Sequence, residues 1–175
     1  LHRVDRRQRQ MCIRDRDCDL LVIGSGAAGL ACAVTAAWHG LKVIVVEKDS
    51  TFGGASAWSG GWMWVPGNPL ARRAGIHENP QQPRTYLKHE LGERYDAARI
   101  DAFLDNGPQM VAFFEQHTAL QFVDGNGIPD IHGQVPGAGI EGHQVIAAPY
   151  DARAIGPLLK RLRKTCLLYT SDAAD

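Results

Sequence analysis

The feature that most constrains the fold of this chain is a cluster of glycines, Gly24-Ser-Gly-Ala-Ala-Gly29. It follows a short apolar, β-branched run, Asp19–Ile23, and it opens an alanine-rich segment without proline, Ala27–His39. A second apolar run, Lys42–Glu47, comes next. The two runs are typical of buried parallel strands, and the segment between them is typical of a helix. A strand, a helix and a strand within about 30 residues form a right-handed βαβ unit, so the sequence predicts an α/β fold.

The glycine spacing matches G-x-G-x-x-G, in which each glycine has a physical role. Gly24 permits a tight turn, Gly26 lets a pyrophosphate approach the backbone, and Gly29 lets the helix pack close to the sheet. The N–H groups and the partial positive charge at the helix N-terminus favour phosphates. Glu47 ends the second strand, where a carboxylate can accept hydrogen bonds from a ribose. The sequence therefore predicts a dinucleotide site without deciding which dinucleotide. The expected contacts are Gly24, Ser25, Gly26, Ala27, Ala28, Gly29, Glu47 and Lys48.

The segment after the second strand separates FAD from NAD. A nicotinamide dehydrogenase normally continues into another helix and strand, whereas Lys48–Gly61 holds two glycine pairs and small residues. This segment resembles the flavoprotein family of 3-ketosteroid Δ1-dehydrogenases and soluble fumarate reductases. The resemblance implies a partial Rossmann-like FAD-binding domain in which the segment runs along the cofactor. It also implies non-covalent FAD, because Gly54 stands where covalent members carry histidine. The implied FAD contacts are Gly53, Gly54, Ala55, Ser56, Gly60 and Gly61.

The next motif favours one branch of this family. Ser59, Gly60, Gly61, Trp64, Pro66, Asn68 and Pro69 fit the pattern S-G-G-x-x-W-x-P-x-N-P, which is similar to the ketosteroid dehydrogenase branch. The resemblance implies hydride transfer between FAD and a CH–CH bond of a cyclic ketone such as a 3-ketosteroid. One departure stands out, because Ile131 follows Pro129-Asp130 where that branch often carries an active-site tyrosine.

Several functional alternatives remain open on the sequence. One is a fumarate- or enoate-type reductase with the same flavin domain, and another is a nucleotide-binding fragment without turnover. Trp62 and Trp64 either line an apolar ligand or pack the loop. His132 is either an acid–base group or a surface residue. The sequence assigns no catalytic residue and no metal ligand. Of its four cysteines, Cys18 and Cys32 lie within residues 17–165 and are expected to be buried free thiols.

The remaining pattern predicts mostly helices. Asp49–Pro69 is expected to be an ordered loop, and Leu120–Val123 is expected to be a strand. Asp130–Pro149, rich in glycine, is left unassigned. Asp151 is expected to cap a last helix through Lys164, with Leu158, Leu159 and Leu162 inward. Three further helices are expected at Pro83–Leu91, Asp96–Asn106 and Pro108–His117.

The two ends of the chain do not resemble protein sequence. Arg6–Arg16 and Cys166–Asp175 match translations of the two strands of one sequencing-adapter oligonucleotide. We therefore expect residues 1–16 and 166–175 to be non-native. Residues 17–165 are expected to be the N-terminal part of an FAD-binding domain.

Composition excludes some partners. The 19 basic and 19 acidic side chains balance, which argues against nucleic-acid or membrane-surface binding. No apolar run reaches the roughly 18 residues of a membrane span. A small-molecule substrate such as a steroid and a cytoplasmic location are expected, and the sequence gives no oligomeric state.

Overall fold

The computed structural model describes residues 16–125 and 127–164. The chain forms two compact units. The first holds the residues up to Ala57 together with those from Lys160 onward, and the second holds Trp58–Leu159. The segments expected to be non-native lie outside the described residues, apart from Arg16, so that expectation stays a prediction.

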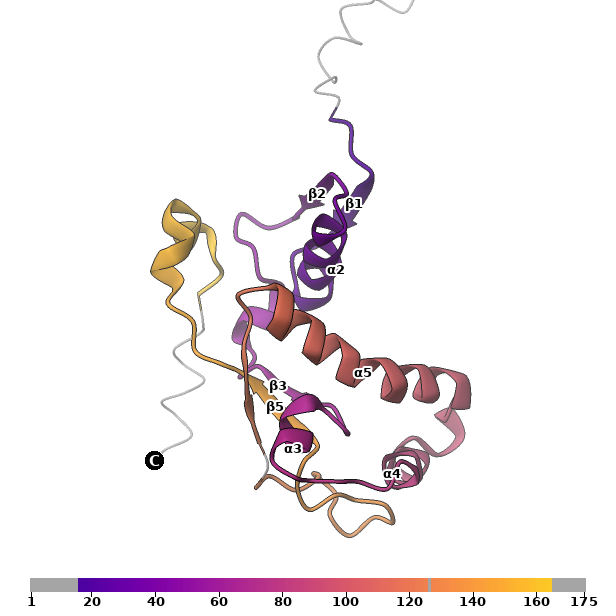
Figure 1. Cartoon of the computed structure of the whole chain (residues 1–175). Coiled ribbons are helices and arrows are strands. Elements are labelled where there is room, and N and C mark those ends of the chain that lie inside the picture. Colours follow the sequence, from indigo (N-terminus) through magenta and orange to yellow (C-terminus); the bar gives the residue numbers. More distant parts are fainter. Residues whose placement is uncertain (1–15, 126, 165–175) are drawn as a thin grey trace, which may run out of the picture. The chain divides into compact units, whose positions relative to one another are not determined.

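The first unit is built on the predicted βαβ arrangement. Strand β1 (Leu20–Ile23) leads into helix α2 (Ala27–Trp38), and strand β2 (Val43–Val46) returns beside β1 (Figure 1). The strands are parallel and paired over all four residues of each. Among the described residues of the first unit, the buried apolar side chains are Val22 and Ala33. The α/β fold expected from the glycine cluster is confirmed.

A later segment of the chain completes this unit. Phe52 forms a parallel bridge with Leu162. The Phe52 N–H donates to Arg161 O at 2.9 Å, and the Arg163 N–H donates to Phe52 O at 2.9 Å. These hydrogen bonds hold Phe52 in place. Phe52 belongs to the segment Lys48–Gly61, which we call the small-residue stretch and which continues into the short 3₁₀ helix η1 (Gly54–Trp58).

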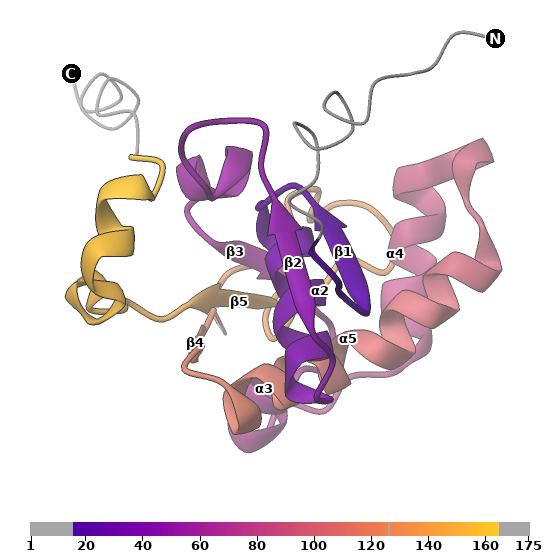
Figure 2. The same cartoon turned by 90° about the horizontal axis from the view of Figure 1, so that it is seen from above.

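The second unit contains three strands, β3 (Trp62–Trp64), β4 (Phe122–Asp124) and β5 (Gln144–Ala147). They form an antiparallel sheet in the order β3-β5-β4 (Figure 2). Val145, at the centre, lies opposite Met63 on one side and Asp124 on the other, and it is fully buried.

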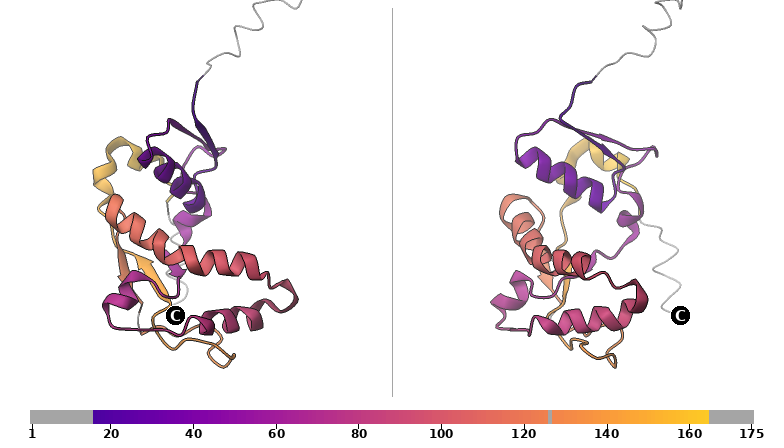
Figure 3. Two further views of the ribbon diagram at one scale, coloured as in Figure 1. Left: turned by 45° about the vertical axis from the view of Figure 1, so that its right-hand side comes forward. Right: turned by 90° about the vertical axis from the view of Figure 1, so that its right-hand side faces the viewer.

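The second unit also contains helices. They are α3 (Pro69–Arg73), α4 (Gln81–Leu91), η2 (Gly92–Arg94) and α5 (Ala97–His117). Helices α4 and α5 form a hairpin (Figure 3).

Helix α5 corrects the prediction of two helices in this region. It runs without interruption through Pro108, beginning at the N-cap Asp96, whose carboxylate accepts the Arg99 N–H at 3.2 Å. Proline removes one backbone hydrogen bond, but the burial of Val111 and Phe114 on the far side of it favours a continuous helix. Tertiary packing therefore overrides the local break.

Four other expectations are wrong. Asp49–Pro69 is not only a loop, because it contains η1 and β3. The expected last helix is instead a 3₁₀ segment, η3 (Ala152–Arg161), kinked at Gly156, where φ is +58°. Leu158 and Leu159 on it are exposed rather than inward. Cys32 is exposed and Cys18 is half-buried, so neither is the buried thiol that the sequence predicts.

Candidate cofactor site

Ser25 is the centre of the candidate site in the first unit. It lies directly after the Gly24 turn, where φ is +95° and a side chain would be strained. Ser25 is 2% exposed. Its N–H donates to Glu47 Oε2 at 2.9 Å, and its hydroxyl donates to the same oxygen. The hydroxyl also accepts the Gly53 N–H at 3.0 Å. One buried side chain therefore joins the glycine turn, the end of β2 and the small-residue stretch.

Glu47 has an unusually acidic carboxyl group. The Asp49 N–H donates to Oε1 at 3.0 Å, and this bond, followed by the two bonds from Ser25, lowers the pKa of Glu47 to about 2. Oε2 already accepts two donors, whereas Oε1 accepts one and keeps a lone pair. The expected hydrogen bond to a ribose therefore fits Oε1, and the carboxylate also holds Ser25 in place.

The small-residue stretch lies against the glycine cluster. The Ala27 N–H donates to Ser56 Oγ at 3.0 Å. A Cβ on Gly54, where φ is +55°, would come within 3.3 Å of Gly26 Cα. Two segments separated by more than twenty residues in the sequence thus form one backbone surface, which we call the cradle.

The N-terminus of α2 fits an anionic group. Its N-cap is Gly26, which gives no side-chain cap, and its first turn holds no acidic residue. A Cβ on Gly26 would meet only Ser56 Oγ, at 3.6 Å, so the space beside the backbone is open. A Cβ on Gly29 would collide with the carbonyl oxygen of Gly24, which explains that glycine by packing. The backbone N–H groups of a helix N-terminus beside an open backbone are suited to a pyrophosphate.

The predicted site residues divide into two groups. Most lie in the first unit around α2 and the end of β2, where Lys48 and Ala55 are exposed. Gly60 and Gly61 belong to the second unit, in which Gly61 O accepts the Ala147 N–H at 3.2 Å beside β5. Their contact with FAD stays a prediction.

The sequence missed an ionic contact beside this site. Asp49 pairs with Arg163, next to the Phe52–Leu162 bridge. Arg163 belongs to a basic run, Lys160–Lys164, and basic residues at this position are typical of the C-terminal end of a helix. Its carboxylate partner lies more than a hundred residues earlier, so sequence spacing could not reveal the pair.

The structure bears on two questions that the sequence left open in the second unit, the roles of Trp64 and His132. Trp64 packs inside it, because its Nε1 donates to Asp130 at 2.7 Å and its ring stacks on Phe103. His132 is exposed and lies 2.7 Å from Glu90, as a surface residue would. Trp64 therefore packs the unit, and a catalytic role of His132 stays untested. None of the helices in the described part of the chain is long and apolar enough to cross a membrane.

Comparison with known proteins adds to this geometry. Residues 19–173 match the model of the FAD binding domain family. The chain is 41% identical over 144 residues to a 3-oxosteroid 1-dehydrogenase of Mycolicibacterium smegmatis, covering 82% of this chain and 25% of that protein. It is 44% identical over 139 residues to a 4-oxocyclohex-2-ene-1-carboxylate 5-dehydrogenase of Sinomonas cyclohexanicum, covering 79% and 23%.

A solved structure has the same fold. The 3-ketosteroid Δ1-dehydrogenase of Sterolibacterium denitrificans, in complex with 1,4-androstadiene-3,17-dione, matches with a TM-score of 0.79 and 34% identity. The match covers 85% of this chain and 26% of that one. The chain therefore spans about a quarter of the length of the relatives it matches.

Proposed function

We propose that this chain, which belongs to the FAD-binding domain family, forms the pyrophosphate-binding part of a flavin-dependent oxidoreductase. The observation that carries the proposal is the convergence of Ser25, Gly53 and Ser56 beside the N-terminus of α2, whose N-cap residue is a glycine. In this proposal the backbone of the glycine cluster binds the two phosphates, and Glu47 Oε1 binds the ribose. When bound, FAD supplies the hydride chemistry, and the protein supplies binding and orientation.

The proposed substrate is a cyclic ketone, oxidised at a CH–CH bond next to the carbonyl group. A hydride and a proton leave adjacent carbons, and a C=C bond forms between them. Support comes from the names of the relatives, which act on 3-oxosteroids and on an oxocyclohexene carboxylate. Ile131 replaces the tyrosine expected from the ketosteroid branch and is 88% exposed. We therefore propose the cyclic ketone class and treat a 3-ketosteroid as one member of it.

A reductase of the fumarate or enoate type is the second candidate. Such an enzyme needs arginines that bind the carboxylates of its substrate. The relatives that match about four-fifths of this chain are named as dehydrogenases of cyclic ketones, which gives the reductase no comparable support.

A flavin titration tests the binding part of the proposal. The purified chain is freed of flavin and titrated with FAD, with NADH as the alternative ligand. We expect saturable binding of FAD, seen as a change in flavin fluorescence, and no competition by NADH. Binding of NADH in preference to FAD would contradict the proposal.

A turnover experiment tests the substrate class. The FAD-loaded protein is mixed with an electron-accepting dye and with androst-4-ene-3,17-dione or 4-oxocyclohexane-1-carboxylate. Dye reduction with either ketone supports the dehydrogenase. Reoxidation of chemically reduced flavin by fumarate, with no dye reduction by either ketone, supports the reductase. Flavin binding with neither reaction supports a binding module without turnover.

A further inference from the structure

The hydroxyl group of Ser25 is committed to two partners within the protein. Ser25 is 2% exposed. Its O–H donates to Glu47 Oε2, and its oxygen accepts the Gly53 N–H at 3.0 Å. A serine hydroxyl has a single proton to donate, and here that proton is used. The side chain of Ser25 therefore acts on a bound cofactor through the two groups that it holds.

The first of these groups is the Glu47 carboxylate, whose Oε1 is proposed above to bind the ribose. A free glutamate side chain rotates about several bonds, and fixing them when a ligand arrives costs conformational entropy. Here the carboxylate is fixed beforehand. Ser25 gives Oε2 two donors, its N–H at 2.9 Å and its hydroxyl, and the Asp49 N–H donates to Oε1 at 3.0 Å. The remaining lone pair of Oε1 therefore has a set direction.

The second group is the backbone of the small-residue stretch at Gly53. Gly53 is buried, and its N–H donates to Ser25 Oγ. A buried N–H group without an acceptor is unfavourable, so this bond favours one position of the stretch. Glu47 and Gly53 lie 22 and 28 residues from Ser25 in the sequence. One hydroxyl group thus connects the carboxylate proposed for the ribose with the stretch that approaches Gly26.

We propose that Ser25 is a positioning residue, which orients Glu47 for the ribose of FAD and couples Glu47 to the small-residue stretch. This inference rests on the proposed function, because it takes the cradle as the FAD site. Without the hydroxyl group, Oε2 keeps one donor and the Gly53 N–H loses its acceptor. The carboxylate then moves more freely, and a ribose hydroxyl gains less from it. A serine with only a structural role would affect every ligand of the cradle equally.

A comparison of two ligands measures how well Glu47 is oriented. FAD and its 2′-deoxyadenosine analogue, which lacks one ribose hydroxyl, are titrated into the flavin-free wild type and Ser25→Ala, with flavin fluorescence as the signal. In the wild type we expect FAD to bind about tenfold more tightly than the analogue, the effect of one hydrogen bond to a charged group. In Ser25→Ala this ratio should fall to about threefold, because one of the three donors to the carboxylate is lost.

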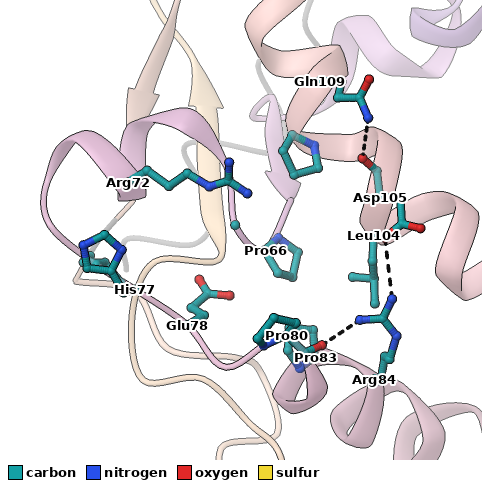
Figure 4. Close-up of a pocket in the computed structure, with 13 residues that line it drawn as sticks. Pro66, Arg72, His77, Glu78, Pro80, Pro83, Arg84, Leu104, Asp105 and Gln109 are labelled. Carbon is teal, nitrogen blue, oxygen red and sulfur yellow. Dashed lines mark hydrogen bonds and ion pairs between the residues drawn. The ribbon is translucent and has the colours of Figure 1, made fainter.

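Two control variants separate the orientation of Glu47 from a general weakening of the protein. Ser56→Ala removes the acceptor of the Ala27 N–H in the same cradle, and it should weaken the binding of both ligands alike. Arg84→Ala removes hydrogen bonds in the second unit, where Arg84 lines a pocket and donates to Pro80 O at 2.7 Å (Figure 4). Both controls should keep the ratio of the wild type.

The outcomes distinguish this inference from the proposed function. The same ratio in the wild type and in Ser25→Ala, or an equal fall in either control, would overturn the positioning role and leave the FAD site standing. A wild type that binds no FAD would refute the proposed function, and the inference with it. Equal binding of FAD and its analogue by the wild type would refute the contact between Glu47 and the ribose.

Hydrogen exchange of the wild type tests the coupling without relying on the folding of a variant. At saturation with FAD, the Gly53 N–H should exchange about threefold more slowly than at saturation with the 2′-deoxyadenosine analogue, because a ribose hydroxyl on Glu47 also holds Ser25 in place. The Ala27 N–H, which donates to Ser56 Oγ, is the internal reference and should be protected equally by both ligands. Equal protection of the Gly53 N–H by the two ligands would refute the coupling.

Discussion

At the residue scale, Gly26 is a position where an added side chain should affect ligand binding but not folding. Its φ of −69° suits any residue, and a Cβ there has only Ser56 Oγ nearby, at 3.6 Å. Gly26→Val should therefore fold normally and lose FAD binding, because its methyl groups fill the space proposed for the pyrophosphate. The flavin titration measures this, with Gly127→Val as the control, since nothing lies within 4 Å of a Cβ at that glycine. Unchanged affinity for FAD in Gly26→Val would contradict the proposed site.

At Gly29, by contrast, an added side chain should affect the stability of the fold. Alanine is the better helix former by about 1 kcal/mol, so propensity alone predicts that Gly29→Ala stabilises α2. The added Cβ would collide with Gly24 O and come within 3.3 Å of Val22 Cγ1. We expect a net loss of about 1–3 kcal/mol in the free energy of unfolding, measured by urea denaturation. A gain in stability would show that the helix can move away from the turn.

Glu47 makes the first unit sensitive to acid. Its pKa falls from the ordinary 4.5 to about 2 through hydrogen bonds from Asp49 and Ser25. The ionised form is favoured in the folded state, so its contribution to stability is present above pH 4.5 and is lost as the pH falls towards 2. Glu47→Gln should lower the melting temperature at pH 7, and the difference from wild type should shrink below pH 4.5. A difference that does not depend on pH would rule out this role.

The residues of the glycine cluster could be predicted because their roles depend on local geometry. A glycine-rich turn between a strand and a helix has few conformations, and sequence spacing reports them directly. The role of Ser25 could not be predicted in this way. Its hydroxyl acts through Glu47 and Gly53, which are 22 and 28 residues away. Such contacts are set by how the chain packs.

At the scale of elements, β5 illustrates the same limit. Gln144–Ala147 forms the central strand of its sheet but lies in a glycine-rich region that the sequence pattern left unassigned. Four residues are too few to show a reliable alternation. What fixes this strand is its pairing with β3 and β4 and the buried cluster around His143 at its start.

This cluster gives the second unit a dependence on pH. Burial alone lowers the pKa of His143, but its hydrogen bonds with Glu78 and Asp130 outweigh burial and raise it above the ordinary 6.5. The charged form is favoured in the folded state, so its contribution is complete below pH 6.5 and is lost as the pH rises through the higher folded value. Urea denaturation of the wild type should show falling stability above pH 6.5.

The variant His143→Ala tests the source of that dependence. It leaves the carboxylates of Glu78 and Asp130 buried without their partner, and we expect a loss of about 3–5 kcal/mol near pH 6. His132→Ala is the control, because His132 is an exposed histidine paired with Glu90. If the wild type and His143→Ala lose stability equally between pH 6 and 9, the histidine is not the titrating group.

At the scale of the whole molecule, the chain leaves much apolar surface in water. Parallel strands are usually covered on both faces, yet Ile23 on β1 is 83% exposed and Leu21 is 53% exposed. Trp38 and Val34 on α2 are also exposed. An isolated pair of strands with one helix gains little from burial, so we expect the first unit to be marginally stable without a ligand.

Binding of FAD should increase the stability of the first unit by mass action. A ligand that binds only the folded state adds about 2.7 kcal/mol at one hundred times its dissociation constant. We therefore expect FAD to raise the melting temperature of the chain and to reduce the fluorescence of a dye that binds exposed apolar surface. Gly26→Val separates this effect from nonspecific stabilisation, because it should melt like the ligand-free wild type whether or not FAD is present. The wild type could instead show a sharp, cooperative transition at high temperature without flavin, and added FAD could leave that transition unchanged. This result would mean that the βαβ unit is stable on its own and that FAD does not bind in the cradle.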